Sequence, residues 1–160
     1  MEKRCFLIRI QNWILKIARA VKTADKNTYF VGHSLGCQGI ARYIESLSGK
    51  TKVGGAVFVA GFFKKLTGLD DKPYMLANTK NWLTTPVDLK KIKLRLPKSI
   101  AIFSDNDPYV ALDNKADFQS KLGSEIVVMK NMGHFSARNG GIYKLPVALD
   151  YVLKIADDSA

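Results

Sequence analysis

A serine lies between two glycines in the segment FVGHSLGCQG, at a point where the residue pattern of the chain changes. Residues 28–31 are β-branched or aromatic and end at Gly32, which predicts a short buried strand. From Leu35 onward the apolar residues recur at helical spacing, so Ser34 occupies a sharp turn from a strand into a helix. Such a turn crowds the positions two before and two after the serine, which favours Gly32 and Gly36, and it exposes the hydroxyl above helix N-terminal amides. Ser34 therefore has the setting of a nucleophile in acyl transfer.

A serine nucleophile needs a general base within hydrogen-bond reach and a carboxylate that orients the base. The chain has two histidines, His33 and His134, which excludes a multi-histidine metal site. His33 is adjacent to Ser34, but neighbouring side chains at a strand end point in opposite directions, so we expect His33 to pack or donate behind the turn. His134 follows the last predicted strand, in the loop KNMGHFSARNGG. Loops after parallel strands gather at one edge of the sheet, and the base is therefore predicted to be His134.

The carboxylate is expected to follow the preceding strand, where the segment IFSDNDPYV contains Asp105 and Asp107. Pro108 stiffens the turn and keeps Asp107 out of helical geometry, which favours Asp107. Asp105 remains the alternative, because it could equally be a turn residue that bonds its own backbone. The order Ser34, Asp107, His134 along the chain is that of α/β-hydrolases.

The elements that must position these residues alternate between short apolar strands and amphipathic helices. Strands are predicted at about 28–32, 53–60, 99–104 and 125–129, and helices at about 5–23, 35–48, 86–95, 111–122 and 145–156. This alternation predicts an α/β fold with a parallel sheet of about four strands and helices on both faces, in a single domain over residues 1–160. The segment 61–85 is expected to be irregular.

Composition excludes several classes of function. The net charge is +11, but the lysines are scattered without a five-residue basic block, so we expect a solvated basic surface and not a nucleic-acid partner. Cys5 and Cys37 are too few for a disulfide framework and lack metal-ligand spacing, which predicts reduced thiols and a cytoplasmic location. No apolar stretch is long enough to span a bilayer, so no membrane partner is expected. No metal or cofactor is expected either.

Four segments carry a resemblance to a known family: FVGHSLGCQGIARYIESL, GGAVFVAGF, FSDNDPYV and NMGHF. They resemble the small serine hydrolases of the family of retinoblastoma-binding protein nine and its bacterial relatives, from about Ile10 to the C-terminus. The resemblance implies a compact, lidless α/β-hydrolase in which Ser34, Asp107 and His134 form the catalytic triad. It prefers Asp107 because the aspartate of the family also directly precedes a Pro-aromatic step. No Leu-x-Cys-x-Glu string is present, so pocket-protein binding does not carry over.

The chain departs from this family at its start. Family members begin with a strand, a glycine-containing turn, a helix and another strand, whereas this chain begins at the helix that follows them. A truncated α/β-hydrolase fold is therefore expected, with the strand at 28–32 as an exposed sheet edge, so that the chain self-associates or is only marginally stable. The competing expectation is that residues 4–8 form a strand that pairs with this edge, with the helix starting near Gln11. The turn also supplies one of two oxyanion-hole amides in the family, which leaves the backbone N–H of Leu35 as the expected donor.

Two hypotheses of function follow. The first is an enzyme, a carboxylesterase-like serine hydrolase that cleaves a small-molecule carboxylic ester or related acyl substrate through an acyl-Ser34 intermediate. In it His134 acts as base and then acid, Asp107 orients His134, and the Leu35 N–H binds the oxyanion. The alternative is a catalytically impaired α/β-hydrolase remnant that acts as a protein- or polyanion-binding module, because an oxyanion donor is missing and the charge is strongly positive.

Overall fold

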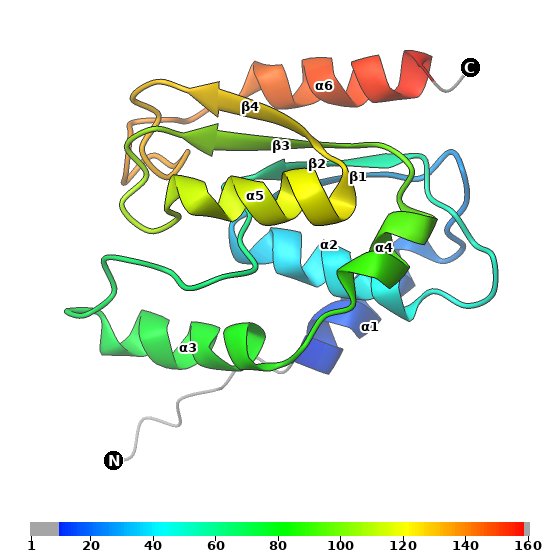
Figure 1. Cartoon of the computed structure of the whole chain (residues 1–160), viewed down its shortest axis with the longest axis horizontal. Coiled ribbons are helices and arrows are strands. Elements are labelled where there is room, and N and C mark those ends of the chain that lie inside the picture. The colour runs from blue at the N-terminus through cyan, green and yellow to red at the C-terminus, as the bar shows by residue number, and fades with distance from the viewer. Residues whose placement is uncertain (1–9, 159–160) are drawn as a thin grey trace.

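Four parallel strands form the sheet at the centre of the computed structural model, which describes residues 10–158. The strands are β1 (Tyr29–His33), β2 (Gly55–Val59), β3 (Ser99–Ser104) and β4 (Glu125–Met129), in the spatial order β1-β2-β3-β4. The main helices are α1 (Ile10–Val21), α2 (Leu35–Ser46), α3 (Pro73–Thr84), α4 (Leu89–Arg95) and α6 (Pro146–Asp157). Helix α6 lies on one face of the sheet, and α2 and the segment around α5 (Lys115–Asp117) lie on the other (Figure 1). The predicted fold class is confirmed.

The two central strands are buried along their whole length, because each has a strand on both sides and a helical layer on both faces. Val57 of β2 pairs with Val31 of β1 and with Ile100 of β3, and Ile102 of β3 pairs with Val127 of β4. This in-register pairing aligns the carboxyl ends of all four strands at one edge of the sheet, to the left in Figure 1. Loops that leave these ends are therefore neighbours in space.

The prediction of an irregular segment over 61–85 is confirmed for residues 61–72 but wrong for residues 73–84, which form helix α3. Its pattern is weakly amphipathic, and the side it buries carries Asn78 and Thr79 beside Trp82. The helix is held by contacts from distant parts of the chain. The buried guanidinium of Arg42 on α2 donates to the carbonyl oxygens of Trp82, at 2.9 Å, and Thr85, at 2.6 Å, at the C-terminal end of α3. Periodicity alone could not show this stabilisation.

The predicted helix over 111–122 is also corrected in detail. It is divided into a 3₁₀ turn (Leu112–Asn114), the short α5 and a π-helical segment (Phe118–Leu122). Asn114 is fully buried in this segment, and its side-chain oxygen accepts the backbone N–H groups of Phe63 and Lys64. Asn114 therefore connects this segment to the loop that follows β2.

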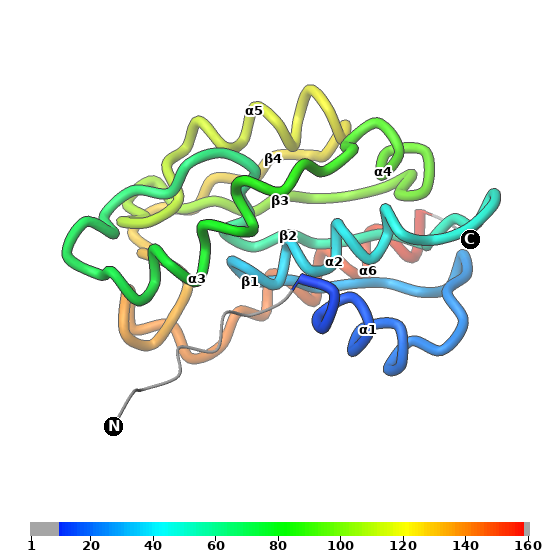
Figure 2. The backbone as a smooth tube through the Cα atoms, turned by 90° about the horizontal axis from the view of Figure 1, so that it is seen from below, coloured from blue at the N-terminus to red at the C-terminus, as the bar shows by residue number. Residues whose placement is uncertain are grey.

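Helix α1 packs on α2 at the outside of the molecule (Figure 2). Trp13 meets Trp82 edge-on, with ring centroids 5.4 Å apart, and a Cβ at Gly39 of α2 would lie 2.9 Å from the Trp13 ring. Among residues 10–158, strand β1 pairs with β2 alone, so it forms one edge of the described sheet as predicted. The part of the helix predicted over residues 5–9, and the competing prediction of a strand at 4–8 beside β1, fall outside the described residues.

Within residues 10–158, no helix has both the length and the apolar character that crossing a membrane requires.

Candidate active site

Ser34 occupies a strained corner between β1 and α2. Its backbone has φ 54° and ψ −121°, a combination that residues with a side chain rarely adopt, and its N–H donates to the carbonyl oxygen of Val59 at 2.9 Å. A Cβ at Gly32 would lie 2.7 Å from Ile40 and 3.1 Å from the backbone nitrogen of Cys37. The strand therefore approaches α2 as closely as it does only because residue 32 is glycine.

The second glycine of the motif has a different position. A Cβ at Gly36 would meet no atom of the described residues within 4 Å. The expectation that crowding explains both glycines is therefore wrong for Gly36, because this residue lies on the open side of the first turn of α2. At this corner there is no room for a side chain at Gly32 on the strand side, whereas there is room for one at Gly36 on the helix side.

His134 lies in a tightly wound loop after β4. Three alternate residues of this loop have positive φ angles: Asn131 at 57°, Gly133 at 53° and Phe135 at 49°. A Cβ at Gly133 would collide with the carbonyl oxygen of Asn139, and the same oxygen accepts the N–H of His134 at 2.9 Å. Gly133 therefore permits the close return of the chain that fixes the backbone of His134.

Side chains at the carboxyl end of β3 and directly after it hold the His134 loop by a series of hydrogen bonds. The N–H of Asn131 donates to Asp105 Oδ1 at 2.8 Å, and the N–H of Met132 donates to the hydroxyl oxygen of Ser104 at 3.0 Å. The N–H of Gly133 donates to Asn106 Oδ1 at 2.8 Å. Consecutive residues of one loop thus bind consecutive residues of the other.

This series, which we call the 104–106 clamp, defines the backbone from which His134 projects. Ser104 is buried, and its hydroxyl donates to Asn106 Oδ1 at 2.8 Å, so the clamp is also linked within itself. Asp105 belongs to the clamp, where its Oδ1 accepts the N–H of Asn131, whereas the carboxylate beside His134 Nδ1 is that of Asp107. Sequence reasoning identified Asp105 as an alternative acid and did not identify Ser104 or Asn106. The polar run of Ser104, Asp105 and Asn106 at the carboxyl end of a predicted strand was the feature of the sequence that could have identified them.

Ser34, His134 and Asp107 form one connected row of side chains. His134 Nε2 lies 2.9 Å from Ser34 Oγ, and His134 Nδ1 lies 2.8 Å from Asp107 Oδ2. The second carboxylate oxygen of Asp107 accepts the N–H groups of Tyr109, at 2.8 Å, and Val110, at 3.0 Å. Only 1% of the Asp107 side chain and 11% of the His134 side chain are exposed. The carboxylate is thus fixed on one side by the backbone and directed at the imidazole on the other.

The contacts of Asp107 also determine the tautomer of His134. A carboxylate oxygen only accepts, so Nδ1 carries the proton that is shared with Asp107. In the neutral ring, Nε2 is then an acceptor and receives the hydroxyl proton of Ser34. This is the arrangement in which an imidazole can remove a proton from a serine hydroxyl.

His33 contacts the backbone of His134. Its Nε2 lies 2.8 Å from the carbonyl oxygen of His134 and donates to it, and the two imidazole rings are 4.9 Å apart. Burial lowers the pKa of His33, an effect that its hydrogen bond to the His134 carbonyl opposes. The sequence predicted that His33 would pack or donate behind the turn. It did not identify the acceptor, which is the backbone carbonyl of His134.

The remaining polar groups near Ser34 bear on anion binding and metal binding. Leu35 directly follows Ser34 and is the first residue of α2, so its backbone N–H has no acceptor within the helix. In the described part of the chain, no group of three or more His, Cys, Asp or Glu side chains has a geometry that could hold a metal ion. Cys37 is fully buried, and burial raises the pKa of its thiol far above the ordinary value.

Comparison with known proteins places these features in a family context. A family model described as serine hydrolase matches residues 7–152. The YdeN protein of Bacillus subtilis (strain 168) is 29% identical over 142 residues, which cover 89% of this chain and 70% of YdeN.

Solved structures give the same picture. The crystal structure of the ydeN gene product superposes with a TM-score of 0.81 at 26% identity, over 97% of this chain and 79% of that chain. A carboxylesterase of the thaumarchaeon Nitrososphaera gargenis superposes with a TM-score of 0.70 at 14% identity, over 99% of this chain and 76% of that chain. The second of these similarities supports the fold alone.

Proposed function

Because this chain belongs to the serine hydrolase family, we propose that it hydrolyses a small carboxylic ester or a related acyl compound through an acyl-Ser34 intermediate. The observation that carries the proposal is the row of hydrogen bonds from Ser34 Oγ through both nitrogens of His134 to Asp107 Oδ2. A serine hydroxyl is a weak nucleophile until a base removes its proton, and the His134 ring lies at the distance that this transfer requires.

The reaction has two halves. In the first, Ser34 Oγ attacks the acyl carbon while its proton passes to His134 Nε2, and the tetrahedral intermediate collapses when Nε2 returns the proton to the departing alcohol. In the second half, His134 takes a proton from water, the hydroxide attacks the acyl-serine, and the proton returns to Ser34 as the acid leaves. Asp107 stabilises the imidazolium that forms in each half and keeps Nδ1 protonated.

The oxyanion of the tetrahedral intermediate needs donors beside Ser34. We infer that the N–H of Leu35 is one of them, since it has no acceptor within α2. Loss of one oxyanion donor typically costs about a hundred- to a thousandfold in rate. The alternative hypothesis, a catalytically impaired binding module, therefore depends on whether a second donor completes the site.

Labelling with a fluorophosphonate probe tests the proposal. The probe reacts with a serine only when a base activates it, so we expect labelling of the wild-type protein at Ser34 and none in Ser34→Ala. Cys37→Ala is the matched control, because it removes a buried thiol of α2 that donates to the Val59 carbonyl and to no side chain of the row, and it keeps the backbone N–H that binds the Ser34 carbonyl. A folded wild-type protein that is neither labelled nor able to hydrolyse short p-nitrophenyl esters would overturn the proposal and leave the binding module in its place.

Four finer expectations accompany this function. We expect the substrate to be a small acyl compound. The closer resemblance to the family of retinoblastoma-binding protein nine stays an expectation. We also expect a cytoplasmic location, since the buried Cys37 is a free thiol. Finally, we infer self-association through β1, because Val31 is 54% exposed and the strand has one partner in the described sheet.

A further inference from the structure

Cations that are scattered along the sequence gather at the amino ends of the strands, at the edge of the sheet opposite the candidate active site. This edge lies to the right in Figure 1, where the loops that lead into β1, β2 and β3 meet the end of α4. The cations that line hollows at this edge are Lys26, Lys50, Lys52, Lys90, Lys93, Arg95, Lys98, Lys121 and Lys154. We call this surface the basic edge.

Three of the four hollows of the basic edge adjoin one another. Lys26 and Lys52 line one hollow with Pro97, and Lys52 lines the next with Lys50 and Arg95. Pro97 is shared in turn with the hollow that Lys98 lines, so the cations of these three hollows form one continuous surface. The fourth hollow shares no lining residue with them, but its Lys93 directly precedes Leu94, which lines the hollow of Lys50 and Lys52.

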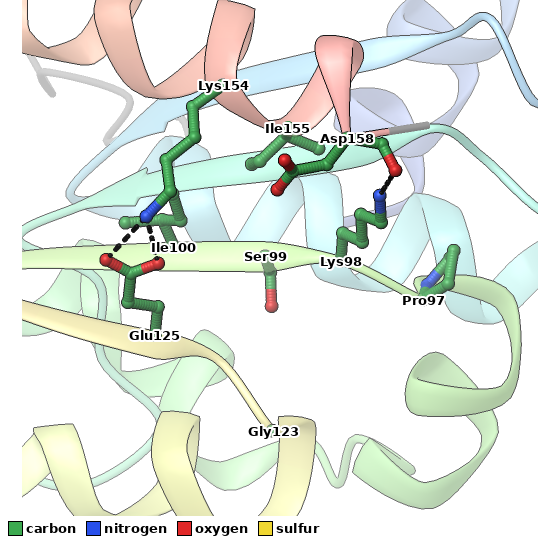
Figure 3. Close-up of a pocket in the computed structure, with 9 residues that line it drawn as sticks. All are labelled: Pro97, Lys98, Ser99, Ile100, Gly123, Glu125, Lys154, Ile155 and Asp158. Carbon is green, nitrogen blue, oxygen red and sulfur yellow. Dashed lines mark hydrogen bonds and ion pairs between the residues drawn. The ribbon is translucent and has the colours of Figure 1, made fainter. Parts of the chain in front are cut away.

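Part of this positive charge is neutralised within the protein. Figure 3 shows Lys154 paired with both oxygens of Glu125, at 3.0 and 2.7 Å, and Lys98 bound to the backbone carbonyl of Asp158. The carboxylates of Glu125 and Asp158 line the same hollow, so this part of the edge is close to neutral.

The neighbouring part of the edge keeps more of its positive charge. Lys121 pairs with Asp117 at 2.8 Å, and the carboxylate of Asp88 lines the hollow of Lys90 and Lys93. Lys26, Lys50, Lys52 and Lys93 are exposed, and none of them forms an ion pair with another described residue. Asp25 adds one negative charge beside Lys26, and its Oδ1 accepts the N–H of Asn27 and the hydroxyl of Thr28. Cations outnumber carboxylates here, so this part of the surface has a net positive potential.

A leucine lies among these free cations. Leu94 of α4 is 73% exposed, it directly follows Lys93 and precedes Arg95, and it lines a hollow together with Lys50 and Lys52. Exposed leucine next to lysines is the combination that binds at the surface of an anionic bilayer, where the ammonium groups meet the headgroups and the apolar side chain enters the interface.

Two observations favour a lipid surface over a nucleic acid. The free cations of the edge are lysines, which act as point charges, whereas arginine is the residue that binds phosphates in a bidentate manner. Tyr29 lines the hollow of Lys26 and Lys52, but it is half-buried with its ring against Gly54. Among the described residues, the exposed aromatic side chains Tyr74 and Tyr143 do not line the basic edge, so no fully exposed ring is placed there to stack on bases.

We propose that the basic edge docks the protein on an anionic phospholipid bilayer, with Leu94 in the interface and the edge that carries Ser34 turned away from the membrane. This docking needs no membrane-spanning helix. It revises the expectation that no membrane partner exists, because that expectation considered only segments that could span a bilayer. The proposal holds whether or not Ser34 is catalytic.

Cosedimentation with lipid vesicles tests the proposal. The protein should bind vesicles that contain phosphatidylserine and should not bind vesicles of pure phosphatidylcholine. High salt should abolish binding to the phosphatidylserine vesicles. Each cation near an anionic surface contributes about fivefold in affinity, so Lys26→Glu, Lys50→Glu and Lys52→Glu together should weaken binding by about a hundredfold or more. Leu94→Ser should weaken binding without changing the net charge.

The matched control carries the same charge change elsewhere, in Lys65→Glu, Lys80→Glu and Lys144→Glu, which replace exposed lysines that do not line the basic edge. Equal loss of binding in both triple variants, or undiminished binding in the first, would overturn the proposal. A short DNA duplex that binds the wild-type protein more tightly than the vesicles do, without an effect of Leu94→Ser, would overturn it in favour of a nucleic acid. Fluorophosphonate labelling of Ser34 in both triple variants shows separately whether the serine is reactive, so a failure of membrane docking can be distinguished from a failure of the proposed hydrolase activity.

Discussion

His134 Nε2 lies 2.9 Å from Ser34 Oγ, although 100 positions separate the two residues in the chain. The distance follows from the parallel sheet, since Ser34 leaves the carboxyl end of β1 and His134 leaves that of β4. These are the outer strands of the described sheet, so the loop after β4 must cross the ends of β2 and β3 to reach Ser34. The 104–106 clamp and the contact with His33 hold the loop in this crossing position.

The identity of the acid can be decided with two isosteric variants. Asp107→Asn should lower kcat by about a thousand- to ten-thousandfold, because the amide no longer stabilises the protonated imidazole or its tautomer. Asp105→Asn should lower kcat only a few-fold, since the amide oxygen still accepts the N–H of Asn131. Steady-state hydrolysis of a short p-nitrophenyl ester measures both. Equal losses in the two variants would contradict the assignment of Asp107.

The two glycines of the Gly-x-Ser-x-Gly motif should respond differently to alanine. Gly32→Ala should lower the free energy of unfolding by about 1–3 kcal/mol, because its Cβ would lie 2.7 Å from Ile40. Gly36→Ala should leave stability unchanged or raise it by up to about 1 kcal/mol, since the site is open and alanine favours a helix. Urea unfolding followed by circular dichroism compares the two variants. A larger loss in Gly36→Ala than in Gly32→Ala would show that the packing at this corner is not as described.

Asn106 should act as a positioning residue for His134. Its Oδ1 accepts the N–H of Gly133 and the hydroxyl of Ser104, so Asn106→Ala should loosen the loop and lower kcat by about ten- to a hundredfold with little change in KM. Asn106→Asp keeps an acceptor at the same place and should restore most of the rate. Steady-state kinetics of both variants, with thermal unfolding as the check on folding, tests this role. A parallel rise of KM in Asn106→Ala would indicate a substrate contact instead.

His33 should make the stability of the protein depend on pH. Burial lowers its pKa in the folded state below the ordinary value of 6.5, so the unfolded chain binds a proton more readily. Its contribution to stability is therefore complete above that value and is lost as the pH falls through the folded-state pKa. His33→Gln keeps a donor for the His134 carbonyl but does not titrate. Urea unfolding between about pH 8 and pH 5 should show a smaller loss of stability in His33→Gln than in wild type. Parallel curves would contradict the prediction.

Association through β1 should depend on the protein concentration and on Val31. A lysine near a strand edge opposes pairing with a second strand, so Val31→Lys should shift the protein toward monomer in sedimentation velocity. Val128→Lys is the matched control, because Val128 is exposed on β4, the other edge of the described sheet. Wild-type protein that remains monomeric at all concentrations would contradict the prediction.

The sequence by itself determined the features that depend on local chemistry. Short continuous apolar runs located β3 and β4 at their observed bounds, and the strand-to-helix change placed Ser34 at the turn between β1 and α2. Because parallel strands end at a common edge, the order of the chain then predicted which loops meet there. For these features the relevant interactions are between residues close in sequence, or follow from strand direction alone.

The tertiary structure decided the features that depend on residues distant in sequence. Helix α3 has a weak pattern of its own and is held by Arg42 from α2. A Cβ added at Gly36 would meet no described atom within 4 Å, whereas one added at Gly32 would collide with Ile40. The donation of His33 to the backbone of His134 and the collection of lysines into the basic edge likewise join separate loops. Periodicity and residue type describe a segment and its own burial, whereas packing distances and surface charge density arise only when several segments share one region of space.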